Sequence, residues 1–467
     1  MKIIIRTLMI VMMLKSGILK SQQISILEIE SKLDAQIENL IRETGIPSVS
    51  IALFNSDSVF ISKAYGYSNV ASKVKATPKT IYHTGSSFKT VTATAVMQLS
   101  DSGLIDLDSP VNNYLKRVSI DNSFDCDCDI TFRHLLSHQA GLKGNTELTN
   151  LWERTELKSL ECIAKNVKQI KKPGKEFEYC NHCYVISALA LEDVLNTSFN
   201  SYITNQILEP LQININPLIP TPVMTEMLAI PYKLENNKAK PDNYVRFDVY
   251  PAGDAYMNPT LFARILIPQI NKGKYQEEQL INDKSVQDMQ SKQFDNENYG
   301  LGLFLGSIES HKTISHGGIL PGFTSYYLID LETKVGVYIM SNAGEIRPIL
   351  ENLSKYIIRL MNGNKGIADL PSFKTKEAIE VSESILKTYV GKYEVAPNVF
   401  ADITYEENSL FVQITGQPKF DLFAYEETKF SLKVMEAQIE FTKDVNGQVI
   451  GLILYQGQNK VPGKRVD

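Results

Sequence analysis

Hydrophobic and polar positions follow two different periods along the chain, and these periods divide it into segments. Residues 26–44 repeat apolar side chains at helical spacing and end at Gly45, which predicts an opening helix. Residues 48–65 then alternate around a polar turn at Asn55–Ser58 and predict a β-hairpin. From residue 86 to about residue 290 the pattern is mostly helical, with long polar loops.

A second group of strand patterns follows this helical region. It covers residues 299–306, 311–318 and 324–342, and a helix is predicted from about Pro348 to Met361. Strands therefore occur on both sides of a helical middle. This order predicts an α+β fold, in which one antiparallel sheet is made from both ends of the region, is flanked by helices and has a helical insertion beside it. A functional site is expected in the cleft between the two layers.

The pattern of hydrophobic and polar residues changes after residue 362. Residues 363–384 are polar and rich in glycine or charge, and they predict a linker. Beyond it, short alternating strands are joined by turns such as Asn446–Gly447. We therefore predict a main domain at residues 22–362 and a small all-β barrel at residues 385–467.

The first 21 residues are of the kind that directs export. Lys2 and Arg6 precede an apolar run at Leu8–Leu14, and small or polar residues follow around Ser16–Ser21. This order is typical of a secretory signal peptide, and the apolar run is far shorter than the ~20 residues that span a bilayer. A helix resting on a membrane surface is the alternative. We expect an exported protein, periplasmic or secreted, without a stable membrane span.

Composition excludes one class of partner. The chain has 467 residues, 43% hydrophobic and 22% charged, which suits a soluble protein of two or three domains. The net charge is −5 and no basic run occurs, so nucleic-acid binding is not expected, because phosphate contacts need clustered lysine and arginine. The expected partner is a small-molecule or peptide substrate, and the oligomeric state stays open.

Five cysteines do not form a dense disulfide framework in a chain of this length. Cys126 and Cys128 are too close in sequence for an unstrained bridge. Cys180 and Cys183 have the spacing of a redox pair but lack the βαβ context of a thioredoxin-like domain. We therefore expect structural thiols or at most one disulfide.

A serine and a lysine in "YHTGSSFKT", residues 82–90, carry the first chemical signal. The residues that follow predict a helix that ends at Gly103. On such a helix Lys89 lies one turn beyond Ser86 and about 60° around the axis, whereas Ser87 faces nearly the opposite way. A serine hydroxyl needs a base to become nucleophilic, and a lysine serves only if its pKa is lowered. The alternative is an N-cap serine and a solvated lysine.

Two further motifs occur in order after this pair. Tyr179-x-Asn181 precedes an apolar helix, and His316-Gly317-Gly318 ends a strand before a glycine-rich turn. With these motifs, roughly residues 28–360 resemble the serine β-lactamase superfamily, and within it the branch of class C β-lactamases, DD-carboxypeptidases, D-aminopeptidases and related esterases. Four further stretches support this resemblance, at residues 131–142, 251–254, 299–303 and 317–323.

The resemblance implies a catalytic set. Ser86 would attack a carbonyl and become acylated, while Lys89 and Tyr179 would share its proton and later return it to the leaving group. The C-terminal strands resemble the small lipocalin-like domains appended to some members of the superfamily.

The resemblance also implies a set of binding residues. Asn181 would orient the lysine and hydrogen-bond a substrate amide. The backbone N–H of Ile319, with that of the nucleophile, would hold the oxyanion. His316, with Gly317 and Gly318, would border the substrate and face its carboxylate.

Two departures from the family pattern bear on the substrate. His316 stands where β-lactamases usually have lysine, and Cys180 stands where the middle residue of the second motif is usually small. Peptidase, amidase or esterase activity is therefore expected ahead of antibiotic hydrolysis. Because histidine has a reference pKa of about 6.5, we expect binding of carboxylate substrates to weaken as the pH rises from 6 to 8.

A metal site is not predicted. His134 and His138 are four residues apart, but Leu135 stands where a metalloprotease needs glutamate, and no third ligand is evident. Packing or hydrogen bonding is the expected role of both histidines, and no cofactor is expected.

The main hypothesis is therefore an exported serine hydrolase that forms an acyl-enzyme on Ser86 and acts on D-amino-acid peptides, amides or esters. The alternative is a penicillin-binding or sensor-type module that acylates slowly and hardly turns over. A non-catalytic scaffold is a third reading, and the intact set of Ser86, Lys89 and Tyr179 argues against it.

Overall fold

The computed structural model describes residues 25–121, 124, 128–153, 156–235, 237–295, 298–363, 370, 379–397, 399–406, 408–415, 419–432, 437–456 and 459–466. The expected signal peptide and most of the expected linker lie outside these residues. Among the helices that are described, none combines the length and the apolar character that a bilayer crossing needs.

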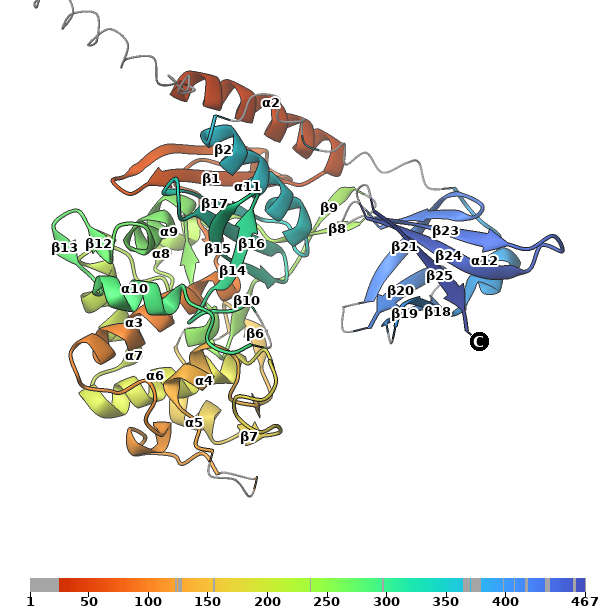
Figure 1. Cartoon of the computed structure of the whole chain (residues 1–467). Coiled ribbons are helices and arrows are strands. Elements are labelled where there is room, and N and C mark those ends of the chain that lie inside the picture. Colours follow the sequence, from red (N-terminus) through yellow and green to blue (C-terminus); the bar gives the residue numbers. More distant parts are fainter. Residues whose placement is uncertain are drawn as a thin grey trace, which may run out of the picture.

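The central element is a seven-stranded antiparallel sheet in the order β14-β15-β16-β17-β1-β2-β3 (Figure 1). β17 pairs with β1 in antiparallel register, and Ile51 lies opposite Ile339. Strands from the two ends of the main region thus lie side by side, which confirms the predicted α+β fold. The strands are β1 (Ser48–Asn55), β2 (Val59–Asn69), β3 (Val74–Lys75), β14 (Phe304–Ile308), β15 (His311–Leu320), β16 (Phe323–Asp330) and β17 (Val335–Ser341).

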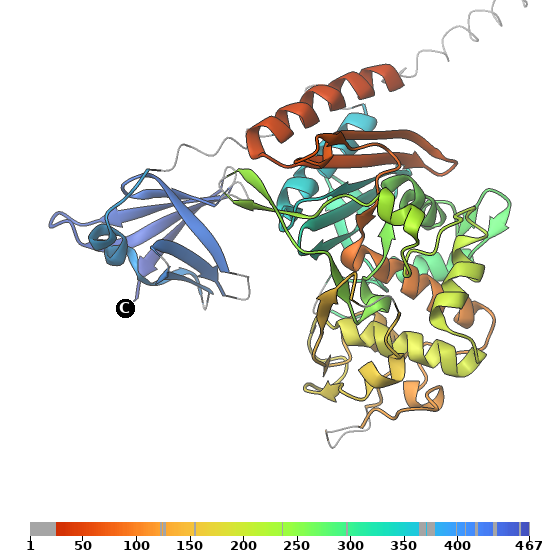
Figure 2. The ribbon, with the colours of Figure 1, turned by 180° about the vertical axis from the view of Figure 1, so that it is seen from behind.

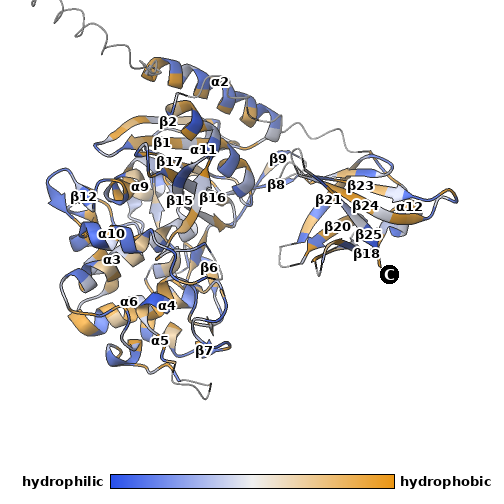
Figure 3. Ribbon diagram, in the orientation of Figure 1, coloured by the Kyte–Doolittle hydropathy of each residue, from blue (hydrophilic) through white to orange (hydrophobic). Residues whose placement is uncertain are grey.

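Helices α2 (Ile26–Thr44) and α11 (Arg347–Met361) cover one face of this sheet. The Ser25 side chain accepts a hydrogen bond from the Glu28 N–H at the start of α2, and the helix ends at Gly45 in the left-handed conformation. Its buried residues recur every three or four positions and form one core with the sheet; Figure 3 shows hydrophobic and hydrophilic residues alternating along it.

The other face packs against α3 (Lys89–Asp101), α9 (Pro259–Leu266) and the helical region that contains α6 (Asn181–Leu195). This region is less uniformly helical than expected, because the described residues also hold five two-stranded sheets. All of their strands are only two to four residues long and too short to show alternation.

The remaining helical elements are η1 (Gly85–Phe88), η2 (Val111–Asn113), α4 (Phe132–Leu136), α5 (Leu160–Ala164), α7 (Phe199–Tyr202), η3 (Ile203–Leu208), α8 (Pro222–Glu226), η4 (Tyr250–Ala252), η5 (Ile267–Gln269) and α10 (Asp283–Met289). The short strands are β4 (Tyr82–His83), β5 (Leu142–Lys143), β6 (Leu148–Asn150), β7 (Lys168–Gln169), β8 (Tyr232–Glu235), β9 (Lys238–Pro241), β10 (Val245–Phe247), β11 (Tyr256–Met257), β12 (Lys274–Tyr275) and β13 (Glu278–Gln279).

The C-terminal strands close into an eight-stranded antiparallel barrel beside the main domain, as predicted (Figures 1 and 2). Its own core includes Tyr389, Tyr393, Phe430 and Phe441, and none of the core residues is shared with the two cores of the main domain. The elements are α12 (Glu383–Tyr389), β18 (Gly391–Ala396), β19 (Val399–Glu406), β20 (Ser409–Ile414), β21 (Lys419–Glu426), β22 (Lys429–Ser431), β23 (Ala437–Lys443), β24 (Val449–Gln456) and β25 (Asn459–Arg465).

The cysteines differ from expectation. Cys180 and Cys183 form a disulfide, Cys128 is disulfide-bonded as well, and Cys162 is free and exposed. The prediction of at most one disulfide was wrong. The start of α6 places the Cα atoms of Cys180 and Cys183 5.4 Å apart, which is within the range that a disulfide bridges.

We expect a chain that ends at residue 370, and so keeps Leu370 packed against the core under α2 and α11, to keep the unfolding transition of the main domain. The barrel has a separate core, so removing it takes no residue from the two cores of the main domain. In calorimetry the Tm should change by less than about 3 °C, since a loss of 1 kcal/mol shifts a large domain by roughly 2–4 °C. A fall of more than about 10 °C would show that the barrel stabilises the main domain.

Candidate active site

The segment that carries Ser86 folds as a tighter turn than an α-helix. η1 is a 3₁₀ helix and α3 begins at Lys89. In a 3₁₀ turn the side chains at positions i and i+3 lie one above the other. The Lys89 Nζ atom donates a hydrogen bond to Ser86 Oγ at 3.0 Å. Ser87 is fully buried and hydrogen-bonds Ser325, with 2.9 Å between the two Oγ atoms. The structure thus brings Ser86, and not Ser87, to Lys89.

Lys89 has only neutral acceptors around its amino group. Besides Ser86, its Nζ atom donates to Asn181 Oδ1 at 2.7 Å and to the Ala252 carbonyl oxygen at 2.9 Å. An ammonium has three protons, and all three find an acceptor here. Burial lowers the pKa of Lys89 well below its ordinary value, and among the described residues no carboxylate pairs with it to offset that loss of hydration. A neutral amine, able to accept a proton, is therefore favoured at this position.

Tyr179 contacts the same serine. Its hydroxyl hydrogen-bonds the Ser86 side chain, and the Lys89 Nζ atom lies 4.8 Å from the centre of its ring. The residue is 41% exposed, but desolvation around its hydroxyl raises the pKa of Tyr179 to about 12, although the bond to Ser86 and the positive charge of Arg347 act in the opposite direction. The phenol is protonated at neutral pH and is available as a proton donor.

His138 supports Tyr179 from behind. The two ring centres are 4.2 Å apart, and His138 Nδ1 accepts a hydrogen bond from the Cys180 N–H at 3.0 Å. The histidine is fully buried, so it fixes the backbone just after Tyr179 as well as the position of its ring.

Backbone contact brings the strand of the third motif against the nucleophile turn. A Cβ atom added to Gly318 would lie 2.2 Å from the Thr84 carbonyl oxygen and 2.8 Å from the Ser86 nitrogen. One added to Gly85, whose φ is +53°, would lie 3.1 Å from the Ile319 nitrogen. Only glycine permits this approach, and it places the backbone nitrogens of Ser86 and Ile319 at one contact.

His316 is buried rather than turned toward solvent. Its Nε2 atom lies 3.1 Å from the Tyr299 hydroxyl and its Nδ1 atom 2.9 Å from the Gly317 carbonyl oxygen. Burial lowers the pKa of His316 well below its ordinary value, and the charge of Arg347, as well as any proton held by Lys89, acts in the same direction. The histidine is therefore neutral between pH 6 and 8. This corrects the expectation that its titration in that range would control carboxylate binding.

Arg347 is a cation at this site that none of the three motifs predicts. Its Nε atom lies 3.2 Å from where a Cβ atom on Gly317 would be, and its guanidinium carbon is 5.7 Å from the Phe304 ring centre. Its charge reaches both Tyr179 and His316, and among the described residues it forms no ion pair. The residue belongs to no motif and stands far from the others in sequence, so only the packing of α11 against β15 and β16 reveals it.

A buried polar network fixes the position of the turn that carries Ser86. Arg246 Nε donates to Asp254 Oδ2 at 2.9 Å, and Asp254 Oδ1 lies 3.0 Å from His83 Nε2. His83 Nδ1 in turn accepts the Gly85 N–H at 3.1 Å. In the sequence, residues 251–254 support only the family resemblance. Their role in holding the residue before Ser86 depends on contacts between distant segments.

The two histidines considered as metal ligands have separate roles. His134 closes the cap of α4 with Thr131, whereas His138 lies beside Tyr179. Within the part of the chain that the structure describes, no group of three or more His, Cys, Asp and Glu side chains could hold a metal ion.

Comparison with known families covers most of the chain. Residues 33–352 match the family described as Beta-lactamase, and residues 375–464 match a Domain of unknown function (DUF3471).

Three individual proteins that are similar to this chain share 22–26% sequence identity with it. Protein flp of Staphylococcus aureus (strain NCTC 8325 / PS 47) is 26% identical over 339 residues, which are 70% of this chain and 66% of that protein. Penicillin-binding protein 4* of Bacillus subtilis (strain 168) is 22% identical over 407 residues, 81% of this chain and 86% of that protein. The structure of the octameric penicillin-binding protein homologue from Pyrococcus abyssi superposes with a TM-score of 0.60 at 23% identity, covering 93% of this chain and 99% of that one.

The buried histidines predict a pH dependence of stability. The folded state lowers the pKa of His138 and His316, so the unfolded chain binds more protons once the pH falls below about 6.5. The free energy of unfolding should therefore decrease between pH 7.5 and 5.5, by at most ~1.4 kcal/mol per pH unit for each group. Urea unfolding at both pH values measures it.

His316→Gln should reduce that decrease. The matched control is His311→Gln: Asp330 raises the pKa of the partly exposed His311, so His311 stabilises the fold at low pH and its removal should steepen the decrease. Equal pH profiles for the wild type and His316→Gln would contradict the assignment of a neutral, buried His316.

Proposed function

The chain belongs to the beta-lactamase family of serine hydrolases, and from this premise we propose that it forms an acyl-enzyme on Ser86. The observation that carries the proposal is the hydrogen bond of 3.0 Å between Ser86 and a lysine that is fully buried among neutral acceptors. A lysine in such surroundings acts as a base, whereas a solvated lysine does not.

The proposed reaction starts at the serine hydroxyl. The Lys89 amine takes the Ser86 proton while Oγ attacks the substrate carbonyl. The backbone N–H groups of Ser86 and Ile319 stabilise the oxyanion that forms. The Tyr179 phenol donates its proton to the leaving group, and the Lys89 ammonium then restores that phenol. Attack by water on the acyl group releases the second product and regenerates the serine.

The proposed substrates are D-amino-acid peptides, amides or esters. Asn181 Oδ1 accepts from Lys89, which leaves its amide N–H₂ group for a substrate carbonyl. Arg347, on the Tyr179 side of the site, supplies a permanent positive charge for a carboxylate on the leaving-group portion. This takes the place of the charge that a lysine in the third motif would carry.

Export to the periplasm or the medium remains part of the proposal. The amino-terminal 21 residues support it, and so does the disulfide between Cys180 and Cys183, because disulfides persist in oxidising compartments. A module that acylates slowly and hardly turns over is the alternative. It shares the same Ser86 chemistry and differs only in the rate at which water removes the acyl group.

Ser86→Ala should abolish covalent labelling by a fluorophosphonate and turnover of p-nitrophenyl esters. Ser87→Ala is the matched control, because Ser87 bonds Ser325 and does not contact Lys89. Intact mass spectrometry and ester turnover measure both effects. Equal losses in the two variants would show that the nucleophile has been misassigned, and labelling without turnover in the wild type would favour the slowly acylating alternative.

Arg347→Gln should change substrate preference. Losing a charge-assisted hydrogen bond costs roughly 1.5–3 kcal/mol, so kcat/KM for D-alanyl peptides should fall about tenfold or more relative to that for a neutral ester. Because a guanidinium keeps its charge, the wild-type ratio of the two values should not vary between pH 6 and 8. Arg359→Gln, a change on the same helix, serves as the control. An unchanged ratio in Arg347→Gln would exclude Arg347 from carboxylate recognition.

A further inference from the structure

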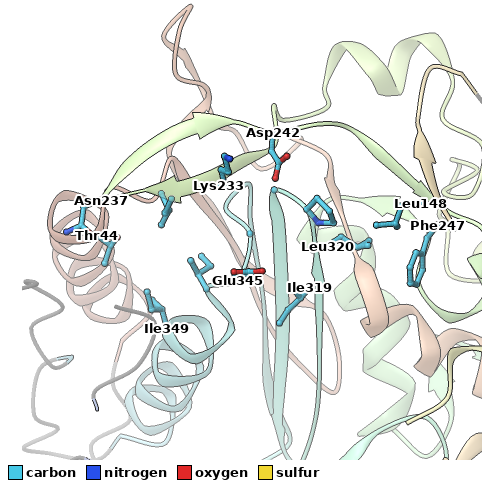
Figure 4. A pocket seen from close by; sticks show the side chains of 15 residues that line it. Thr44, Leu148, Lys233, Asn237, Asp242, Phe247, Ile319, Leu320, Glu345 and Ile349 are labelled. Atoms are coloured by element: carbon cyan, nitrogen blue, oxygen red, sulfur yellow. The ribbon is translucent and has the colours of Figure 1, made fainter. Parts of the chain in front are cut away.

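A cavity of about 540 Å³ lies at the end of β15, next to the candidate active site. Figure 4 shows Ile319 and Leu320 on its wall, with Leu148 and Phe247 at one end and Thr44 and Asn237 at the other. The hairpin of β8 and β9 arches over it. Its volume is within the range of about 300–1,000 Å³ that is typical of small-molecule sites.

Ile319 connects the cavity to the reacting carbonyl. Its backbone nitrogen lies at the contact with the nucleophile turn, while its side chain, 46% exposed, forms part of the cavity wall. A substrate whose carbonyl oxygen is bound by this nitrogen therefore has the cavity within reach. None of Ser86, Tyr179 and Arg347 lines the cavity, so it extends away from the group that protonates the leaving atom.

The cavity is apolar where it meets the cleft and acidic at its rim. Leu148 is 49% exposed and stands beside the half-buried Phe247, so two large apolar side chains border water at this end. Among the described residues that line the cavity, Asp242 and Glu345 lie at the rim with a single cation, Lys233, which is paired with Glu235 at 3.0 Å. Such walls favour apolar groups and disfavour anions.

We propose that this cavity binds the acyl portion of the substrate and selects extended, apolar acyl groups over anionic ones. The inference rests on the proposed function, because it places the leaving group beside Tyr179 and Arg347 and the acyl group beyond Ile319. The substrate would then carry its negative charge, if any, on the leaving-group side only.

The test uses p-nitrophenyl acetate, butyrate, hexanoate and octanoate, which share one leaving group. With the full-length wild type, kcat/KM should rise by up to about fourfold for each methylene group that enters the cavity. Leu148→Asp should flatten this dependence on chain length. Leu104→Asp is the matched control, because Leu104 is also 49% exposed and does not line the cavity.

A second pair of substrates tests the charge selection. The p-nitrophenyl monoester of adipic acid has nearly the length of the hexanoate ester but ends in a carboxylate. The wild type should prefer the hexanoate at least tenfold, and Glu345→Lys should reduce that preference by several fold. Glu309→Lys, which changes an exposed glutamate outside the cavity, should leave it unaltered.

The outcomes separate the inference from its premise. A flat chain-length profile in the wild type, or equal slopes in Leu148→Asp and Leu104→Asp, would overturn the inference while leaving the acyl-enzyme intact. A rise with alkyl chains on the leaving group, in a series of phenyl acetates, would overturn the assignment to the acyl portion. If neither esters nor a fluorophosphonate acylate or label Ser86, the proposed function itself fails, and the inference fails with it.

Discussion

The burial of one lysine without a carboxylate partner is the constraint on which the site depends. Lys89 is removed from water and bonded to Ser86, Asn181 and the Ala252 carbonyl oxygen. These three acceptors come from three separate segments. If any segment moved, the amino group would lose an acceptor or gain water, and its pKa would return toward the ordinary value. The chemistry proposed at Ser86 therefore requires that η1, α6 and η4 are all in place.

Two kinds of support keep these segments in place. The first is direct backbone contact, because Gly318 and Gly85 let β15 touch the turn that carries Ser86. The second is a set of buried polar contacts, in which Asp254 and His83 hold the Gly85 N–H and His138 holds the Cys180 N–H. Buried polar groups are costly unless they are fully paired, and the buried Nε2 atom of His138 has no hydrogen-bond partner among the described residues. The presence of these groups around Gly85 and Cys180 indicates that the positions of the two segments matter more than their separate stability.

Charge is distributed unevenly around the site. Arg347 lies on the side of Tyr179 and His316, whereas Asp242 and Glu345 lie on the rim of the cavity beyond Ile319. His316 is buried and neutral, so it adds no charge to either side of the site. In the function that we propose, the charge of the substrate would be matched by groups outside the three motifs. A histidine in the third motif would then be compatible with a substrate that carries a carboxylate.

Local sequence determined the α+β class, the sheet built from two distant parts of the chain, the separate barrel, and the order of the three motifs. These features follow from periodicity and from residues close in sequence, such as Ser86 and Lys89. Tertiary structure alone decided the neutral state of His316, the place of Arg347, the network under Gly85 and the cavity beyond Ile319. The reason is physical. A pKa depends on desolvation and on charges that folding brings near. A cavity depends on which segments pack around it. Neither can be derived from the spacing of residues along the chain.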